Sequence, residues 1–334
     1  MKIAFFGSGS IACYIGGLLS NSKNEVVLYG RSYMQKCIIE NGLTLTDYKG
    51  NHQKFDSSQI NYSTNITDIC DSDLIIITVK SHATQSVLDE LCPIVSKSTR
   101  LISLQNGVHN YRLMRSIAND HQVANSMVPY NVVNQGDGHF HRGTEGQLIF
   151  ERCYETGLLV EELKKVGLEA ELSDDIYSVL WGKLLLNLNN ALNTLSNLPL
   201  KEQLSDRNFR LILAKCIDEG LTLLNKANIV PAQVGKVPPQ HISKILSLPN
   251  FLFKIVANSM LKIDPQARSS MWEDLQAGRE SEIDYLNGEL ISLATQMNEQ
   301  LPINQVIYDL VKECFAVGKS PEISGKTLRE LTGC

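Results

Sequence analysis

The feature that most constrains the fold is a glycine-rich stretch, IAFFGSGSIA, close to the N-terminus. It joins the short apolar run Ile3 to Phe6 to the helix-like segment Ile11 to Leu19. Between them lies a GxGxxA pattern made of Gly7, Ser8, Gly9, Ser10, Ile11 and Ala12. In such a pattern the first glycine makes a tight turn, the second lets the backbone approach a pyrophosphate, and the last small residue lets helix and strand pack closely. The stretch therefore predicts the first βα unit of a dinucleotide-binding domain, with a purely structural turn as the alternative.

The rest of the first half alternates strand-like and helix-like segments. Glu25 to Tyr29 is predicted to be the second strand, and Leu101 to Leu104 a later one. Leu74 to Val79 (LIIITV) is a β-branched run of the kind that is buried on both faces of a parallel sheet. This order predicts an α/β fold with a Rossmann-like, doubly wound sheet and right-handed crossovers.

The end of the second predicted strand, Tyr29-Gly30-Arg31, bears on the choice of cofactor. An NAD site usually has an Asp or Glu there to hold the ribose 2′-hydroxyl. A guanidinium instead suits a 2′-phosphate, which a carboxylate would repel. Arg31 therefore predicts NADP(H); the alternative is that it is a solvated residue at the start of a helix.

Two further loops follow predicted strands and carry polar residues. Lys80 comes after the strand that ends near Val79, and Asn106 lies in Gln105-Asn106-Gly107 after the next. Ligands bind at the carboxyl edge of open α/β sheets, where both loops should lie. Each could be an ordinary turn, since Asn-Gly is a common turn dipeptide. Together they predict contacts to cofactor and substrate.

The second half has a helical texture that begins at about Ser173. Its long periodic segments are Ile176 to Leu195, Phe209 to Ala227, Asn250 to Leu261 and Ser281 to Met297. The stretch Val230 to Pro239 contains three prolines and should separate two helices. We therefore predict an NADP-binding Rossmann-like domain over residues 1–172 and an all-helical domain with substrate and catalytic residues over 173–334.

Composition narrows the class of partner. A formal net charge of -5, without any Lys/Arg-rich run, speaks against a nucleic-acid partner. The run Ile3 to Phe6 is shorter than the ~7 to 15 apolar residues of a signal peptide, and no run approaches the roughly 18 of a membrane span. We expect a cytoplasmic protein, not bound to a membrane, that acts on a small molecule as a monomer or homodimer.

Neither the cysteines nor the histidines indicate a metal site. The eight cysteines are scattered without a CxxC pair, which is typical of reduced thiols rather than of disulfides or a zinc site. His139 and His141 form an HxH motif, but no Cys or acidic residue lies nearby at ligand spacing. We predict that no metal is bound.

The leucine-rich segment WGKLLLNLNNALN contains a lysine and four asparagines. At about 100° per residue on one helix, Asn187 and Asn190 fall within about 40° of Lys183 and form one polar stripe. Asn189 and Asn193 point elsewhere and are predicted to be caps or packing contacts. The stripe either faces solvent or, on a buried helix, faces a cleft; the apolar remainder of the segment favours the cleft.

A second polar constellation begins at Ser269 and continues to Asp284. Ser270 and Glu273 fit a capping box, so Ser270 is predicted to be a helix N-cap, a position that would also suit a substrate carboxylate. Glu282 lies among several acidic residues. Taken alone, it is predicted to be a solvated charge.

In order and spacing, these motifs resemble the ketopantoate reductase (2-dehydropantoate 2-reductase) family over nearly the whole chain. The motifs are GxGxxA at Gly7, Tyr29-Gly30-Arg31, Val79-Lys80, Gln105-Asn106-Gly107, Trp181-Gly182-Lys183 with Asn187, and Ser269-Ser270-Met271 followed by Glu282-Ile283-Asp284 and Asn287-Gly288. The resemblance implies an NADPH-binding Rossmann domain and a helical domain with the active site between them. It also implies reduction of 2-dehydropantoate to (R)-pantoate on the route to pantothenate and coenzyme A.

By this resemblance, each motif residue receives an expected role. Lys183 matches the lysine that gives a proton to the carbonyl oxygen, and Glu282 matches the acid that holds the substrate and steadies the lysine. Asn106 and Asn187 match positioning residues, and Ser270 matches a contact to the substrate carboxylate. In the cofactor site, Arg31 and Lys80 match cofactor contacts, Arg31 toward the 2′-phosphate.

One position departs from the family pattern. Some members carry a second substrate asparagine eight residues after the lysine, where this chain has Ala191. Either Asn190 replaces that asparagine, or the pocket differs and the natural substrate is another branched 2-oxo acid. A non-catalytic NADPH-binding sensor is the third reading, which the set Lys183, Asn106 and Glu282 disfavours.

Overall fold

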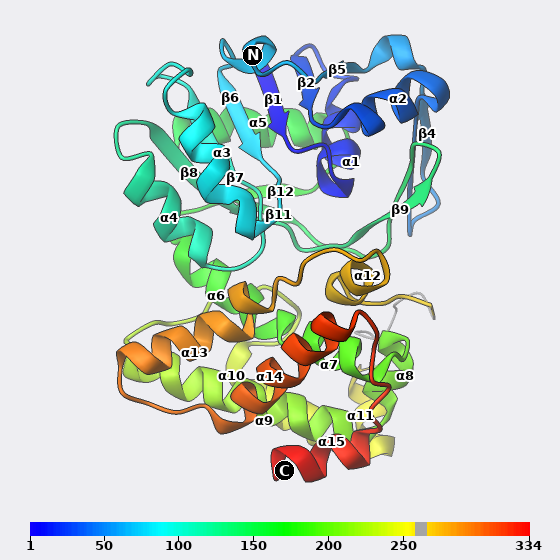
Figure 1. Cartoon of the computed structure of the whole chain (residues 1–334), viewed down its shortest axis with the longest axis vertical. Coiled ribbons are helices and arrows are strands. Elements are labelled where there is room, and N and C mark those ends of the chain that lie inside the picture. Colours follow the sequence, from blue (N-terminus) through cyan, green and yellow to red (C-terminus); the bar gives the residue numbers. More distant parts are fainter. Residues whose placement is uncertain (258–265) are drawn as a thin grey trace. The chain divides into compact units, whose positions relative to one another are not determined.

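The computed structural model describes residues 1–257 and 266–334 (Figure 1). Internal contacts divide the chain into an N-terminal unit, Met1–Tyr177, and a C-terminal unit, Ser178–Cys334. All strands of the described residues belong to the first unit, and helices make up the second. The predicted fold class is confirmed. Residues 258–261 of the predicted helix Asn250 to Leu261 lie outside the described residues.

The N-terminal unit contains most of the alternating elements. In chain order they are β1 (Lys2–Phe6), α1 (Ser10–Leu19), β2 (Glu25–Tyr29), α2 (Ser32–Asn41), β3 (Leu43–Asp47), β4 (His52–Phe55), η1 (Ser57–Gln59), β5 (Asn61–Ser63), η2 (Ile66–Ile69), β6 (Leu74–Ile77), η3 (Ser81–Ala83), α3 (Thr84–Leu91), β7 (Arg100–Ser103), α4 (His109–Ile117), β8 (Gln122–Met127), β9 (Val132–Gly136), β10 (His139–Arg142), β11 (Leu148–Glu151), α5 (Tyr154–Lys165) and β12 (Ala170–Ser173).

An eight-stranded sheet forms the centre of this unit, in the order β12-β11-β8-β7-β6-β1-β2-β5. Its neighbouring strands are parallel except for the antiparallel pair β8 and β11. The order reverses at β1, since β2 and β5 lie on one side and β6, β7 and β8 on the other. Such a switch point creates a crevice at the carboxyl ends of the strands, here those of β1 and β6.

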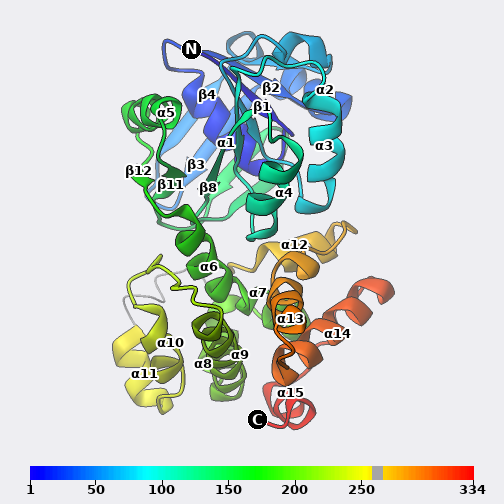
Figure 2. The same ribbon diagram turned by 90° about the vertical axis from the view of Figure 1, so that its left-hand side faces the viewer.

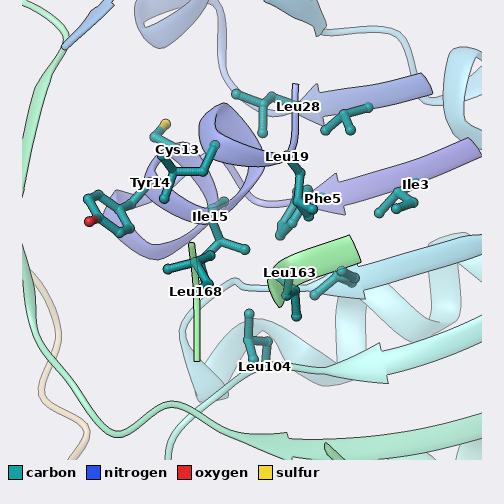
Figure 3. Close-up of a cluster of buried hydrophobic side chains, with 14 of the residues drawn as sticks. Ile3, Phe5, Cys13, Tyr14, Ile15, Leu19, Leu28, Leu104, Leu163 and Leu168 are labelled. Atoms are coloured by element: carbon teal, nitrogen blue, oxygen red, sulfur yellow. The ribbon is translucent and has the colours of Figure 1, made fainter. Parts of the chain in front are cut away.

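Alternate residues of the strands supply two separate cores. Ile3 and Phe5 of β1 face the core that includes α1 and α5, whereas Ala4 and Phe6 face the core of α3 and α4. Figure 2 shows α5 and α3 on opposite sides of the sheet, and Figure 3 shows Ile15 and Leu19 of α1 directed toward Phe5. Burial on both faces accounts for the continuous apolar runs of these strands.

A second, four-stranded sheet, β4-β3-β10-β9, was not predicted from the sequence. Leu43, Leu45 and Phe140 on its strands join the core formed by α1 and α5. The two histidines of the HxH motif lie on β10, and His139 Nε2 and His141 Nδ1 are each 2.8 Å from Thr46 Oγ1. Over residues 1–257 and 266–334, no group of three or more His, Cys, Asp or Glu side chains is placed to hold a metal ion.

Helices make up the second unit. In chain order they are α6 (Ile176–Asn187, which begins just before the boundary), α7 (Asn189–Ser196), α8 (Leu200–Ser205), α9 (Arg207–Lys226), α10 (Pro239–Leu246), α11 (Asn250–Ala257), α12 (Ser270–Gln276), η4 (Ile283–Tyr285), α13 (Asn287–Gln296), α14 (Pro302–Val317) and α15 (Gly325–Thr332). The proline-rich stretch separates α9 from α10, as predicted. None of the described helices is long and apolar enough to cross a bilayer.

Two segments predicted as single helices are divided. The segment Ile176 to Leu195 is interrupted at Leu188, where asparagines, which are mediocre helix formers, surround the junction. The segment Ser281 to Met297 is interrupted at Leu286, whose φ of -116° and ψ of -95° lie outside the helical region. Both predictions of continuity were wrong.

The cysteines agree with the sequence-based expectation. All eight are unpaired thiols. Cys13 and Cys216 are fully buried, and burial raises the pKa of both thiols. Since the thiolate is the reactive form, these two side chains are chemically inert packing groups.

Candidate functional site

The glycine loop follows β1 and is held at the crevice by contacts with the ends of two neighbouring strands, β2 and β6. The Gly7 N–H donates to Tyr29 O at 3.0 Å, and Thr78 Oγ1 donates to Gly7 O at 2.6 Å. Gly7 has a φ of +106°, and a Cβ there would lie 2.7 Å from Val79 Cγ1. Both the backbone conformation and the close approach of β6 therefore require glycine at this position.

Gly9 presents open space at the start of α1. It is exposed and serves as the N-cap of the helix, and a Cβ placed on it would meet no atom within 4 Å. The first turn of α1 holds no acidic residue. Ala12 is fully buried against the sheet, whereas Ser10 and Ile11 are half-buried. Uncapped N–H groups beside an open glycine fit the pyrophosphate of a dinucleotide.

Arg31 is the N-cap residue of α2, and its backbone is linked to the glycine loop by the Tyr62 hydroxyl. Its carbonyl accepts a hydrogen bond of 2.9 Å from Tyr62 Oη, which is itself 2.5 Å from Ser8 Oγ. The Arg31 guanidinium is exposed and makes no hydrogen bond or ion pair within the part of the chain that the structure describes. It is available to an anion, although the sequence-based alternative of a solvated arginine fits the same exposure.

The loops that carry Lys80 and Asn106 are joined by a buried polar network. Gln105 Nε2 donates to Val79 O and to Thr84 Oγ1, both at 2.8 Å. Thr84 Oγ1 donates to Asn110 Oδ1 at 2.8 Å, and Asn110 Nδ2 donates to Asn106 O at 3.3 Å. The network fixes the ends of β6 and β7 relative to α3 and α4. It therefore holds in place the backbone that carries the half-buried Lys80 and Asn106.

Replacing Asn110 should be costly because its partners are buried. Asn110→Leu would leave the Thr84 hydroxyl without its acceptor and remove two donated bonds. We expect the free energy of unfolding to fall by about 2 to 3 kcal/mol. Urea unfolding would measure this, with Ser116→Ala as the control on the same helix, because Ser116 is exposed and should change stability by less than about 0.5 kcal/mol. An equal effect of the two variants would contradict the role of the network.

In the C-terminal unit, α6 carries the predicted catalytic lysine on a tightly packed helix. Gly182 allows the close packing, because a Cβ there would lie 2.1 Å from Ala232 O. Trp181 is fully buried, Asn187 is buried one turn after Lys183, and Lys183 itself is half-buried. Burial lowers the pKa of the Lys183 ammonium to about 8. Lys183 and Asn187 therefore do not form a fully solvated stripe.

The asparagines of α7 divide by role. Asn193 is fully buried and donates to Leu198 O at 2.8 Å and to Gln203 Oε1 at 2.9 Å. Asn189 Oδ1 accepts from Gln203 Nε2 at 2.7 Å, so the predicted packing roles of Asn189 and Asn193 are confirmed. Asn190 is half-buried, beyond the interruption at Leu188. A stripe drawn along one continuous helix therefore does not extend unchanged from Lys183 to Asn190.

The N-cap of α12 is Ser269 and not Ser270. Ser269 Oγ accepts from the Trp272 N–H at 3.2 Å and donates to Asn190 O at 3.3 Å, while the Ser269 N–H donates to Asn193 Oδ1 at 2.9 Å. These contacts with α7 set the start of the helix one residue earlier than predicted. Ser270 is the first helical residue and is half-buried. It directly follows Ser269, the residue that contacts Asn190.

The burial of Glu282 contradicts another prediction from the sequence. It is only 5% exposed, whereas its neighbour Asp284 forms a surface ion pair with Lys312 at 3.2 Å. Glu282 lies at the start of η4, and the turn of this short helix separates the two acids. The prediction of a solvated charge is wrong, because tertiary packing and not local composition sets its exposure.

Several residues that fix these positions were not identified from the sequence: Tyr62, Thr84 and Asn110. Each acts through contacts between segments far apart in the chain. The only local signal was the presence of polar side chains next to the predicted loops. Of the predicted set, the structure brings the glycine loop, Arg31, Lys80 and Asn106 to one sheet edge, and places Lys183, Asn187, Asn190, Ser270 and Glu282 in the helical unit.

Comparison with known families accounts for both units. A model described as ketopantoate reductase PanE/ApbA matches residues 3–153, and one described as its C-terminal part matches residues 175–314. The chain belongs to the ketopantoate reductase family. It is therefore an oxidoreductase of that family, and the resemblance inferred from the sequence is confirmed.

Individual relatives extend over nearly the whole chain. A 2-dehydropantoate 2-reductase of Pyrococcus horikoshii is 28% identical and covers 95% of this chain and 99% of its own. The crystal structure of a PanE/ApbA family ketopantoate reductase from Ralstonia eutropha has a TM-score of 0.80 at 27% identity, over 95% and 99% of the two chains. D-mandelate dehydrogenase with NADH and anilino(oxo)acetate also has a TM-score of 0.80, at 20% identity over 95% and 99%, which shows a shared fold alone.

Proposed function

We propose that this family member is an NADPH-dependent reductase of 2-dehydropantoate, which it converts to (R)-pantoate for pantothenate and coenzyme A synthesis. The observation that carries the proposal is the half-buried Lys183, whose pKa is lowered to about 8 next to the buried Asn187. Lysine side chains are rarely buried in folded proteins, and a lowered pKa suits proton transfer near neutral pH.

The N-terminal unit would hold the cofactor. The N–H groups of the glycine loop would bind the pyrophosphate, the exposed Arg31 would bind the 2′-phosphate, and Lys80 and Asn106 would contact the cofactor near the ends of β6 and β7. Bound NADPH supplies a hydride. The open space at Gly9 and the lack of an acidic residue at the end of β2 support this assignment.

Lys183 would supply the proton. As a ketone is reduced, negative charge develops on its oxygen, which a nearby ammonium stabilises and then protonates. With a pKa of about 8, Lys183 is still mostly protonated at pH 7 and gives up its proton more readily than an ordinary lysine. Glu282, through its carboxylate, would hold the substrate and steady the lysine.

The remaining predicted contacts would orient the substrate. The amides of Asn106, Asn187 and Asn190 would bind its polar groups, and Ser270 would bind its carboxylate. Family resemblance supports these roles for Asn106, Asn187 and Ser270, and the burial of Asn187 supports its availability to a desolvated ligand. Asn190 is proposed because Ala191 is fully buried and supplies no polar side chain.

Ala191 also favours a second candidate, a reductase of another branched 2-oxo acid. The choice can be made by steady-state NADPH oxidation with 2-dehydropantoate and a panel of other branched and aromatic 2-oxo acids. The highest kcat/KM with 2-dehydropantoate would support the proposal, and a higher value with another acid would favour the second candidate. Absence of turnover with every acid would contradict both and leave a cofactor-binding sensor.

Arg31→Ala tests the choice of cofactor. We expect the KM for NADPH to rise about 10- to 100-fold, because a charge-assisted contact to the 2′-phosphate is lost, while the KM for NADH changes little. Arg112 is an exposed arginine on α4, and Arg112→Ala is the control that should leave the NADPH/NADH ratio unchanged. An unchanged ratio in Arg31→Ala would contradict the assignment of Arg31.

A further inference from the structure

One tyrosine hydroxyl joins the two loops that the cofactor would contact. Tyr62 lies on the edge strand β5, where it pairs with Leu28 of β2. Tyr62 Oη donates to Arg31 O at 2.9 Å and is 2.5 Å from Ser8 Oγ. The hydroxyl therefore contacts both the glycine loop and the backbone of the proposed 2′-phosphate residue, although 31 residues separate Tyr62 from Arg31.

The donors in this relay can be assigned. A phenol has one proton, and the Tyr62 proton is given to Arg31 O, so the Ser8 hydroxyl must donate to Tyr62 Oη. Burial raises the pKa of Tyr62 to about 12, so the phenol keeps its proton at neutral pH. Because the Ser8 hydroxyl donates its proton to Tyr62, it presents only lone pairs to a phosphate and would repel it. The backbone N–H of Ser8 is then the group that would bind the cofactor.

Gly30 provides the room for this relay. A Cβ at Gly30 would lie 2.0 Å from Ser8 Oγ and 2.6 Å from Tyr62 Oη. The Gly30 N–H donates to Ser63 O at 3.1 Å, next to Tyr62 on β5. The chain before Arg31 is thus held between the glycine loop and β5, with the relay filling the space beside it.

We propose that Tyr62 is a positioning residue for cofactor discrimination, because it fixes the Arg31 backbone relative to the glycine loop so that the guanidinium meets a 2′-phosphate while the loop holds the pyrophosphate. The inference rests on the proposed NADPH specificity. It adds a residue that touches no reacting atom but sets the distance between two anion-binding positions.

Tyr62→Phe removes only the oxygen of the relay. Calorimetric binding of 2′-phospho-ADP-ribose and of ADP-ribose to the full chain would measure discrimination without turnover. We expect the ratio of the two affinities to fall about 3- to 10-fold, as for the loss of one or two hydrogen bonds. Thermal melting, recorded in parallel, ensures that the folded protein is measured.

Two control variants separate the possible outcomes. Tyr130→Phe removes a buried phenol oxygen of the same unit, one without a hydrogen-bond partner among the described residues, and should leave both affinities unchanged. If Arg31→Ala abolishes discrimination but Tyr62→Phe keeps the full ratio, or weakens both ligands equally, the positioning role is wrong while the proposed function stands. If Arg31→Ala itself leaves the ratio unchanged, the proposed NADPH specificity is contradicted, whatever the result for Tyr62→Phe.

Discussion

Lys183→Met is expected to lower kcat by about 10²- to 10⁴-fold while leaving the affinity for NADPH nearly unchanged. The variant keeps the apolar stem and removes the ammonium that would stabilise and protonate the developing oxyanion. Lys215→Met is the control, since Lys215 is exposed on α9 of the same unit and should have no effect on kcat. A Lys183→Met rate close to that of the unmodified chain would show that another group donates the proton.

The pH dependence of kcat should follow the same group. The protonated lysine is the active form, so kcat should decline as the pH rises through about 8, the lowered pKa of Lys183. In Lys183→Met the small residual rate should lose this decline. A decline that persists unchanged in the variant would assign it to a different residue.

Stability should change in the opposite sense to activity. The folded pKa of about 8 lies below the value of about 10.4 for an unfolded lysine, so the unfolded chain binds more protons between these pH values. The burial penalty is therefore fully present below pH 8 and disappears as the pH rises toward about 10.4. Lys183→Met should be more stable than the unmodified chain at pH 7, by about 1 to 3 kcal/mol, and the difference should shrink by pH 10. Urea unfolding at the two pH values checks this sign.

The second large effect concerns the glycine loop, where two substitutions should behave differently. Gly7→Ala and Gly9→Ala should each weaken NADPH binding by about 100-fold or more, but only Gly7→Ala should lower the free energy of unfolding. At Gly7 the φ of +106° and the 2.7 Å approach to Val79 Cγ1 strain the fold itself. At Gly9 the added methyl group meets no protein atom within 4 Å and would instead occupy the space proposed for the pyrophosphate.

Calorimetric titration with NADPH and urea unfolding of both variants would test this difference. We expect Gly7→Ala to lose about 1 to 3 kcal/mol of stability and Gly9→Ala to remain within about 0.5 kcal/mol. If Gly9→Ala binds NADPH normally, the loop does not hold the pyrophosphate. If Gly7→Ala is as stable as the unmodified chain, the strain argument is wrong.

The elements best predicted from the sequence are those with a strong local pattern. The strand Glu25–Tyr29 was predicted with its observed bounds, and the glycine loop was placed correctly between β1 and α1. In each case a run of apolar residues meets a turn that only glycine accommodates easily, so neighbouring residues carry the information. The change to a helical texture after Ser173 was equally local.

The predictions that failed depend on contacts across the fold. The N-cap at Ser269 and the burial of Glu282 are set by other segments, as when Asn193 of α7 binds the Ser269 N–H. The small sheet contains the alternating stretch LTLTD at Leu43–Asp47, a period-two signal that was present but short. Tyr62 gave no local sign of its contacts with Ser8 and Arg31.

The most direct test of the proposed activity is isotope transfer. The protein is incubated with 2-dehydropantoate and NADPH that carries deuterium at both C4 positions, and the pantoate formed is analysed by mass spectrometry. We predict pantoate with one deuterium at C2, formed far more slowly by Lys183→Met than by Lys215→Met. Pantoate without deuterium, or no conversion of 2-dehydropantoate at all, would contradict the proposed reduction.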